Sequence, residues 1–138
     1  MADTVAKPLP SISEYNRPFW TYARAHELRL QRCLDCGRPW APIGPVCPRC
    51  FSERFEWARM SGRGVIASWI VFHKLYHPAF AADLPYNVAF VELEEGPRLI
   101  SNVVGVRNDA LRIGLPVEVV FDDVTDSVSL PKFRPVAA

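Results

Sequence analysis

The sequence predicts a mainly β protein with an N-terminal helix, a four-cysteine module and a five-stranded barrel. Three observations lead to this prediction. Four cysteines fall in two close pairs between residues 33 and 50. A helical pattern with one apolar face precedes them, and five strand-like segments follow residue 64. We expect residues 1–30 to form an arm and a helix, residues 31–60 the cysteine module, and residues 61–138 the barrel with a C-terminal extension.

The composition narrows the classes of function. Sixteen basic residues face fifteen acidic ones, so the net charge is only +1. This balance disfavours a nucleic-acid partner, because non-specific affinity for DNA or RNA comes mostly from phosphate neutralisation. No stretch approaches the roughly 20 apolar residues that span a bilayer, and the start lacks the apolar core of a signal peptide. We therefore expect a cytoplasmic protein with no membrane partner, in which paired cysteines are more often metal ligands than disulfides.

The helix is expected to begin with Asn16 as its N-cap and Pro18 in its first turn, and to run to about residue 27. Steps of three and four place Phe19, Tyr22, Ala23, His26 and Leu30 on one face. Trp20 lies beside that stripe, so the helix carries more aromatic surface than one narrow face hides. Two expectations follow for this surface. The stripe packs against its own domain; alternatively, Phe19, Trp20 and Tyr22 dock onto another subunit, since exposed apolar patches mark interfaces.

The four cysteines, Cys33, Cys36, Cys47 and Cys50, have the spacing of a metal site, in a segment that is otherwise loop-like. Two residues between thiolates allow a tight turn to present both sulfurs to one ion, and four sulfurs complete a tetrahedron. Gly37 permits the left-handed backbone that such a turn needs. The pattern predicts a structural zinc; iron also fits four thiolates, and disulfides are the alternative. A closed ligand set leaves no position for substrate, which argues against catalysis at the metal.

The second half of the chain reads as strands. Strands are expected at residues 65–74, 87–93, 98–106, 116–122 and 127–133, with one helical turn at 108–113. Three strands, a short helical connection and two more strands is the order of an OB-type Greek-key barrel. Both faces of the first strand are apolar, so one face lines the barrel and the other needs a cover: the cysteine module, the helix or a partner protein.

Other motifs for chemistry are weak. There is no Gly-x-Ser-x-Gly, no Walker loop and no dinucleotide fingerprint. The Ser-Gly-Arg-Gly segment at 61–64 resembles a fragment of a phosphate-binding loop, but a hinge before the barrel explains it as well. The acidic group at 92–95 is expected at a solvated hairpin tip. His73 and His77 lie at the end of a strand, so their spacing does not put them on one face, and loop or interface positions are expected.

Several motifs recur together in a known family. They are Cys33-x2-Cys36-Gly37, Cys47-Pro48-x-Cys50, the 61–64 segment, Pro85-Tyr86, Val-Glu-Leu-Glu-Glu-Gly-Pro-Arg at 91–98, the 113–119 segment and Leu-Pro-x-Phe-Arg-Pro at 130–135. Together they resemble the DUF35 family, zinc-ribbon plus OB-fold proteins associated with acyl-CoA metabolism. The resemblance covers residues 10–135, and the combination is more specific than the cysteine spacing alone.

The resemblance implies an accessory subunit. Such proteins accompany thiolase-like enzymes in complexes that make or cleave carbon–carbon bonds of acyl-CoA substrates, and the nucleophilic cysteine belongs to the thiolase-like partner. The chain is then expected to be required by an acyl-CoA-processing enzyme while carrying no catalytic residues itself. Acyl-CoA is an expected ligand where the two chains meet.

Within that reading, Arg63, Lys74 and Arg107 are the expected contacts for CoA phosphates, because they lie at predicted barrel ends. The alternative function is a nucleic-acid-binding ribbon and barrel, for which residues such as Trp69 and Tyr76 supply stacking rings. The near-neutral charge and the acidic turn oppose that alternative.

Overall fold

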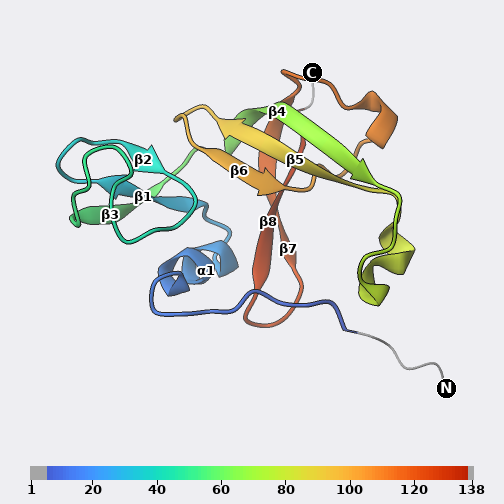
Figure 1. Cartoon of the computed structure of the whole chain (residues 1–138), viewed down its shortest axis with the longest axis horizontal. Helices are drawn as coiled ribbons and strands as arrows, with labels where there is room; N and C mark the ends of the chain where they lie inside the picture. The colour runs from blue at the N-terminus through green and yellow to red at the C-terminus, as the bar shows by residue number, and fades with distance from the viewer. Residues whose placement is uncertain (1–5, 137–138) are drawn as a thin grey trace.

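The computed structural model describes residues 6–136 as one short helix and two antiparallel sheets (Figure 1). The elements are α1 (Arg17–Arg24), β1 (Arg29–Cys33), β2 (Pro39–Trp40), β3 (Phe55–Arg59), β4 (Arg63–Phe72), β5 (Tyr86–Leu93), β6 (Arg98–Ser101), β7 (Pro116–Asp123) and β8 (Ser129–Pro135), with 3-10 turns η1 (Pro78–Asp83) and η2 (Asn108–Ala110). The small sheet has the order β2-β1-β3 and the large one β6-β5-β4-β7-β8. Residues 1–5 of the expected arm, and the last two of the extension, lie outside the described residues.

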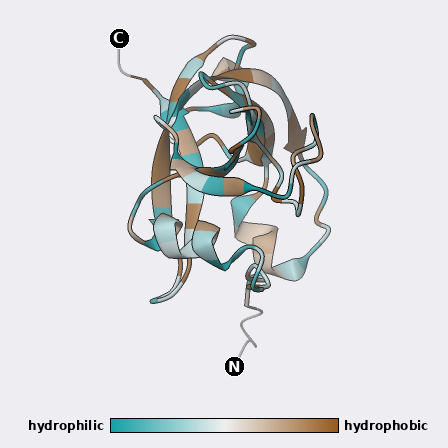
Figure 2. Ribbon diagram, turned by 90° about the vertical axis from the view of Figure 1, so that its left-hand side faces the viewer, coloured by the Kyte–Doolittle hydropathy of each residue, from teal (hydrophilic) through white to brown (hydrophobic). Residues whose placement is uncertain are grey.

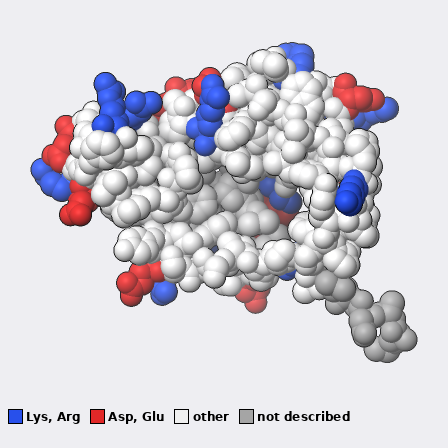
Figure 3. All heavy atoms as spheres, viewed as in Figure 1, with Lys and Arg blue, Asp and Glu red and all other residues white. Residues whose placement is uncertain are grey.

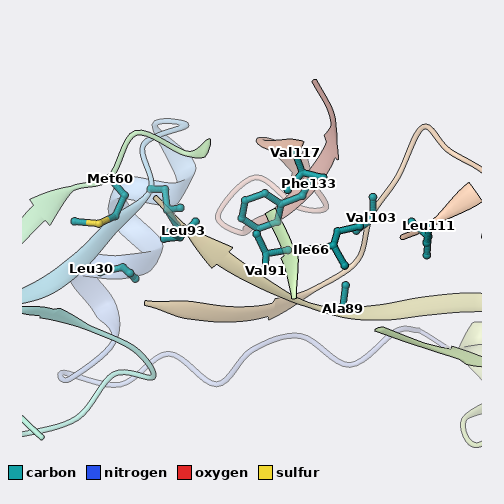
Figure 4. Packing of buried hydrophobic residues seen from close by; sticks show 11 residues of the cluster. Leu30, Met60, Ile66, Ala89, Val91, Leu93, Val103, Leu111, Val117 and Phe133 are labelled. Carbon is teal, nitrogen blue, oxygen red and sulfur yellow. The ribbon is translucent and has the colours of Figure 1, made fainter. Parts of the chain in front are cut away.

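The large sheet curls into a half-barrel, which confirms the predicted OB-type fold. Its open side closes where Val103 forms a parallel bridge with Phe133. Phe133, Ile66, Val91 and Val117 are fully buried inside the curl (Figure 4). Along β5, buried positions alternate with more exposed ones, and Figure 2 shows hydrophobic and hydrophilic bands along the strands of the sheet. The core therefore forms from the inward positions of each strand, as the period of two predicts.

The helix begins as predicted but ends earlier. Asn16 is the N-cap and proline occupies the first turn, yet α1 ends at Arg24 rather than near residue 27. His26 adopts φ of 62°, and two backbone bonds close a Schellman motif around it: its N–H donates to the Ala23 carbonyl at 2.9 Å, and the Glu27 N–H donates to the Tyr22 carbonyl at 2.9 Å. The predicted apolar stripe therefore stops before His26, and Leu30 lies in β1 instead.

Two further features of the strands differ from the prediction. The segment 31–60 is largely turns, as expected, but it also contributes to β1, β2 and β3, which form a small sheet that sequence analysis did not predict. The third barrel strand ends at Ser101, not at residue 106. The buried amide of Asn87 takes over there: its Nδ2 donates to the Val103 carbonyl at 2.8 Å, and its Oδ1 accepts the Val103 N–H at 2.7 Å. The chain is thereby turned toward β8 to close the barrel.

The two glycines at 62 and 64 allow close packing against neighbouring strands of the barrel. A Cβ at Gly64 would lie 2.3 Å from the Glu92 carbonyl oxygen, and one at Gly62 would lie 2.5 Å from Cγ1 of Val119. Gly62 also has φ of +82°. Close backbone approach, rather than phosphate binding, explains why this segment carries glycines.

Candidate functional site

The four cysteines converge at the far end of the ribbon. The Sγ atoms of Cys33, Cys36, Cys47 and Cys50 lie within 4.8 Å of one another. Two of the separations are 3.5 Å and 3.7 Å, close to the edge of about 3.8 Å for a tetrahedron with metal–sulfur bonds of about 2.3 Å. The donor set therefore fits a structural zinc, as the spacing predicted. Among residues 6–136 no other cluster of histidine, cysteine or carboxylate side chains has this arrangement.

Each pair of cysteines lies on a similar backbone turn. The Gly37 N–H donates to the Cys33 carbonyl at 2.9 Å, and the Phe51 N–H donates to the Cys47 carbonyl at 2.8 Å. Gly37 has φ of 78°, as expected from its place after the second cysteine. Phe51 takes the equivalent conformation, φ of 63°, without being glycine, and its ring is exposed. The sequence gives no sign of this second left-handed residue.

Backbone N–H groups adjust the acidity of the thiols. The Cys36 N–H, which donates to Sγ of Cys33 at 3.4 Å, is the main group that lowers the pKa of Cys33 to about 6. The Cys50 N–H lowers the pKa of Cys47 in the same way. The Ser52 N–H also acts to lower the pKa of Cys50, but the sulfur of Cys33, together with burial, outweighs it and raises that pKa to about 12. A metal must displace this last proton, so its affinity falls at low pH.

A groove lies between the ribbon and the β5–β6 hairpin, and we call it the ribbon–hairpin groove. It has a volume of about 1100 Å³. It is lined by residues 38–43 and 48–49 of the ribbon, by residues 90, 92 and 95–100 of the hairpin, and by Phe19 and Leu30. Arg38 and Arg49 lie on the ribbon wall. Within the described part of the chain neither forms an ion pair, whereas Arg54 on the same module pairs with Asp35 at 2.9 Å.

The groove also contains two buried polar atoms without partners. They are Nε1 of Trp40, in a side chain that is 5% exposed, and Oε1 of Glu95. The other oxygen of Glu95 accepts the Ser61 N–H at 2.7 Å. The acidic turn is therefore more than a solvated tip, because one of its carboxylates fastens the hairpin to the ribbon–barrel junction.

The outer surface of the half-barrel presents an apolar face that sequence analysis identified only in part. Ile70 on β4, Phe90 on β5 and Ile100 on β6 are 56%, 42% and 69% exposed. Phe90 pairs across the ladder with Ile100, and Ile70 with Val88, so these side chains are neighbours on one face. We call this the outer sheet face. The apolar second side of the first barrel strand predicted it, but neither the ribbon nor the helix covers it fully.

Two of the three cations expected at CoA phosphates lie far apart. Arg63 and Lys74 lie at opposite ends of β4, a strand of ten residues and hence roughly 30 Å long. Arg63 approaches Glu94 at 3.9 Å, Lys74 lies over the Tyr76 ring at 5.2 Å, and Arg107 pairs with Asp109 at 2.8 Å. Arg63 therefore does not share a site with Lys74. Arg107 lies toward the Lys74 end of β4, because its neighbour Asn108 donates to the Pro85 carbonyl at 3.1 Å and the next residue, Tyr86, pairs with Phe72.

The aromatic residues of α1 are half-buried. Phe19 contacts the core cluster and meets Trp20 edge to face at 4.9 Å. Trp20 lines a smaller cleft of about 300 Å³ beside β8, and the guanidinium of Arg29 stacks on the Tyr22 ring at 4.4 Å. Phe19, Trp20 and Tyr22 each keep some exposed surface. They can therefore contact a partner while they pack against their own chain.

A cluster of polar side chains fastens the end of α1 to the barrel. His26 Nε2 lies 2.9 Å from Asp123 Oδ1, Arg24 Nη1 lies 3.0 Å from the same oxygen, and the buried Ser129 hydroxyl donates to it. The hydroxyl faces the carboxylate and not the imidazole, so the group lacks the order of a nucleophile–base–acid triad. Its role is structural: it holds the end of α1 against β7 and β8, and we call it the Asp123 anchor.

The surface charge of the molecule is mixed. Basic and acidic side chains are interspersed over the face in Figure 3, which agrees with the near-neutral net charge. No helix among the described residues has the length and apolar character needed to cross a membrane.

Two domain families match the chain. The ChsH2 rubredoxin-like zinc ribbon domain matches residues 20–56, and the ChsH2 C-terminal OB-fold domain matches residues 57–122. Among solved structures, the chain is similar to one in the Ltp2-ChsH2(DUF35) aldolase, with a TM-score of 0.84 and 39% identity. That match covers 94% of this chain and all of the other.

Curated relatives agree with this assignment. The chain is 40% identical to a probable enoyl-CoA hydratase alpha subunit of Thermomonospora curvata, covering 94% of this chain but only 40% of that protein's length. It is 34% identical to a DUF35 domain-containing scaffold protein of Methanocaldococcus jannaschii (76% and 79% covered), and 29% identical to the benzoylsuccinyl-CoA thiolase subunit BbsA of Thauera aromatica (75% and 69% covered). The chain belongs to the DUF35 family of zinc-ribbon and OB-fold proteins.

Proposed function

We propose that this chain is an accessory subunit of an acyl-CoA enzyme complex. Its partner is a thiolase-like chain that acts as a thiolase, an acyltransferase or an aldolase. Relatives named as a thiolase subunit and a hydratase alpha subunit support this role, as does the match to a chain of the Ltp2-ChsH2(DUF35) aldolase. The partner supplies the nucleophile, and the zinc keeps the ribbon in the shape that docks. The cytoplasmic location expected from the sequence is part of this proposal.

The outer sheet face is the observation on which the proposal mainly rests. Ile70, Phe90 and Ile100 form neighbouring exposed apolar side chains on three strands. A contiguous surface of this kind marks an interaction site in soluble proteins. Together with the partly exposed aromatic residues of α1, it gives the chain apolar docking surface on both sides of the ribbon–hairpin groove.

The finer part of the proposal concerns acyl-CoA. The half-barrel helps to complete or gate the partner's acyl-CoA site, and a basic residue of this chain contacts the CoA phosphates. Because Arg63 and Lys74 lie at opposite ends of β4, the clustered phosphates of one CoA reach one of these positions only. Single substitutions R63Q, K74Q and R107Q separate the two ends of β4: we expect the KM of the complex for acyl-CoA to rise either in R63Q or in the variants at the other end, K74Q and R107Q, but not at both ends.

The test is reconstitution with a thiolase-like chain from the same cell. We expect the two chains to purify as a stable hetero-oligomer, and the partner's turnover of acyl-CoA to fall when this chain is omitted. Ile70→Glu places a charge on the outer sheet face and should weaken the complex. Ile113→Glu alters a residue that is 72% exposed outside that face and should not. A partner that is stable and fully active alone would overturn the proposal.

A further inference from the structure

We propose that the ribbon–hairpin groove receives an extended acidic segment of the partner protein, which adds a strand to the free edge of β6. This inference rests on the proposed function and specifies how the partner docks. It is argued from the hydrogen-bonding of β6, the charge of the ribbon wall, the unpartnered indole of Trp40, and the apolar side chains beside the edge.

β6 is an edge strand, because it pairs with β5 alone. The Leu93 N–H donates to the Pro97 carbonyl at 2.8 Å, and in this register Val91 bonds with Leu99 and Ala89 with Ser101. The alternate residues, Arg98 and Ile100, therefore turn their backbone N–H and C=O groups away from β5. Both residues line the groove. An edge of this kind is a template for another strand.

The ribbon wall opposite this edge favours an anionic segment. Arg38 and Arg49 line the groove, and neither forms an ion pair within residues 6–136. On the hairpin side, Glu92 lies 3.2 Å from Nε of Arg98, and Glu95 accepts the Ser61 N–H with one oxygen while its other oxygen has no partner within residues 6–136. Two arginines without ion pairs face this one carboxylate, so the free charge of the groove is net positive, which complements carboxylates on the incoming segment.

Trp40 provides an independent indication. Its side chain is 5% exposed and lines the groove, and its indole N–H has no acceptor in the described part of the chain. A buried donor without a partner is unfavourable, and an indole N–H usually finds one. The backbone carbonyl groups of an extended segment in this groove are acceptors of the required kind, and the buried nitrogen reaches one when the Trp40 ring turns toward the groove.

Size and apolar surface favour a peptide segment over a small ligand. The groove is open and, at about 1100 Å³, lies at the upper end of the usual range of small-molecule pockets, about 300–1000 Å³, so it has room for an extended segment. Phe19 lies between its walls, and Ile100, 69% exposed, continues from the groove onto the outer sheet face. Side chains alternate along a strand, so one side of the segment meets these apolar groups while the other meets the arginines.

The test separates backbone pairing from side-chain contact. Ile100→Pro removes an N–H that faces away from β5, a position where an edge strand tolerates proline. Ile100→Ala removes the same side chain but keeps the N–H. In the reconstituted complex we expect I100P to weaken binding of the partner at least tenfold more than I100A. Equal affinities would overturn the inference while leaving the proposed function intact.

A second measurement covers the event that I100P unfolds. A photo-cross-linking residue at position 100 should join an acidic, extended segment of the partner, and one at position 113 should not. Arg38→Glu with Arg49→Glu should weaken the complex tenfold or more with zinc retained, and the control Arg112→Glu should not. An intact complex without cross-links at position 100, or arginine variants that lose CoA binding but keep the partner, would overturn the inference. Failure of the wild-type chain to bind any such partner would remove the proposed function as well.

Discussion

The backbone N–H of Met60 donates to the carbonyl oxygen of Leu28 at 2.8 Å, and both side chains lie in the core of the half-barrel. This bond joins the two ends of the ribbon at its root. The far end has a separate small cluster, made by Cys33, Trp40 and Cys47. The barrel therefore holds the root of the ribbon, and the metal holds its tip. Removing the metal should affect the two ends differently.

The first prediction concerns Cys47→Ser. Cys47 is fully buried and is a ligand, so the variant should lose its zinc and with it a contribution on the order of 10 kcal/mol to ribbon folding. Metal analysis should find no bound zinc, and NMR amide signals of residues 33–55 should lose dispersion while those of β4 to β8 keep it. Glu53→Gln, at an exposed position of the ribbon, should behave as wild type. One equivalent of zinc in C47S would contradict the assignment.

The second prediction concerns the closure of the half-barrel. Phe133 is fully buried where β8 meets Val103, so Phe133→Ala should lower the free energy of unfolding by about 3–5 kcal/mol. Ile113→Ala, at a residue 72% exposed, should change it by less than about 0.5 kcal/mol. Urea unfolding followed by fluorescence measures both. Similar losses in the two variants would show that Phe133 does not close this core.

The third prediction compares two glycines. A Cβ at Gly64 meets the Glu92 carbonyl oxygen at 2.3 Å, and this backbone atom moves only if the β4–β5 ladder shifts. Gly64→Ala should therefore destabilise the protein by about 1–3 kcal/mol. At Gly44 the nearest atoms are 3.9 Å and 4.0 Å away, ordinary contact distances, so Gly44→Ala is the matched control. Thermal unfolding of both variants tests the pair, and a G64A protein as stable as G44A would refute the close approach.

The fourth prediction concerns pH. The Ser129 hydroxyl, then His26 and Arg24, lower the pKa of Asp123 below its ordinary value. A carboxyl whose pKa is depressed on folding stabilises the protein above its unfolded pKa of about 3.9 and loses that effect as pH falls through the native pKa. The free energy of unfolding should therefore decline more steeply below about pH 4 in wild type than in Asp123→Asn. Asp126→Asn, in the exposed turn, should keep the wild-type slope. Identical slopes in wild type and D123N would contradict the anchor.

Residue patterns predicted the cysteine site and the barrel because each depends on local signals. The ligand spacing of Cys33, Cys36, Cys47 and Cys50 specifies a tetrahedral site without knowledge of the rest of the chain. The strand at Pro116–Asp123 alternates so regularly that its two faces are visible in the sequence. The start of α1 was also predictable, since Asn16 and Pro18 are local signals for a helix N-terminus.

The misses depend on contacts that are distant in sequence. The end of α1 at Arg24 follows from the left-handed turn at His26, which the bond to Asp123 across the fold stabilises. β6 ends early because the Asn87 amide replaces a strand partner. The ribbon strands were missed because β2 has only two residues, and because burial along β1 and β3 does not alternate strictly. The groove combines two modules, so no local pattern indicates it.

The most direct test of the central claim is purification of the tagged chain from its native cell, with measurement of the complex mass and identification of the bound protein by its sequence. The account predicts a hetero-oligomer with a thiolase-like chain that turns over an acyl-CoA only when both chains are present. A chain that elutes alone, or one that carries nucleic acid in a salt-dependent complex instead, would contradict it.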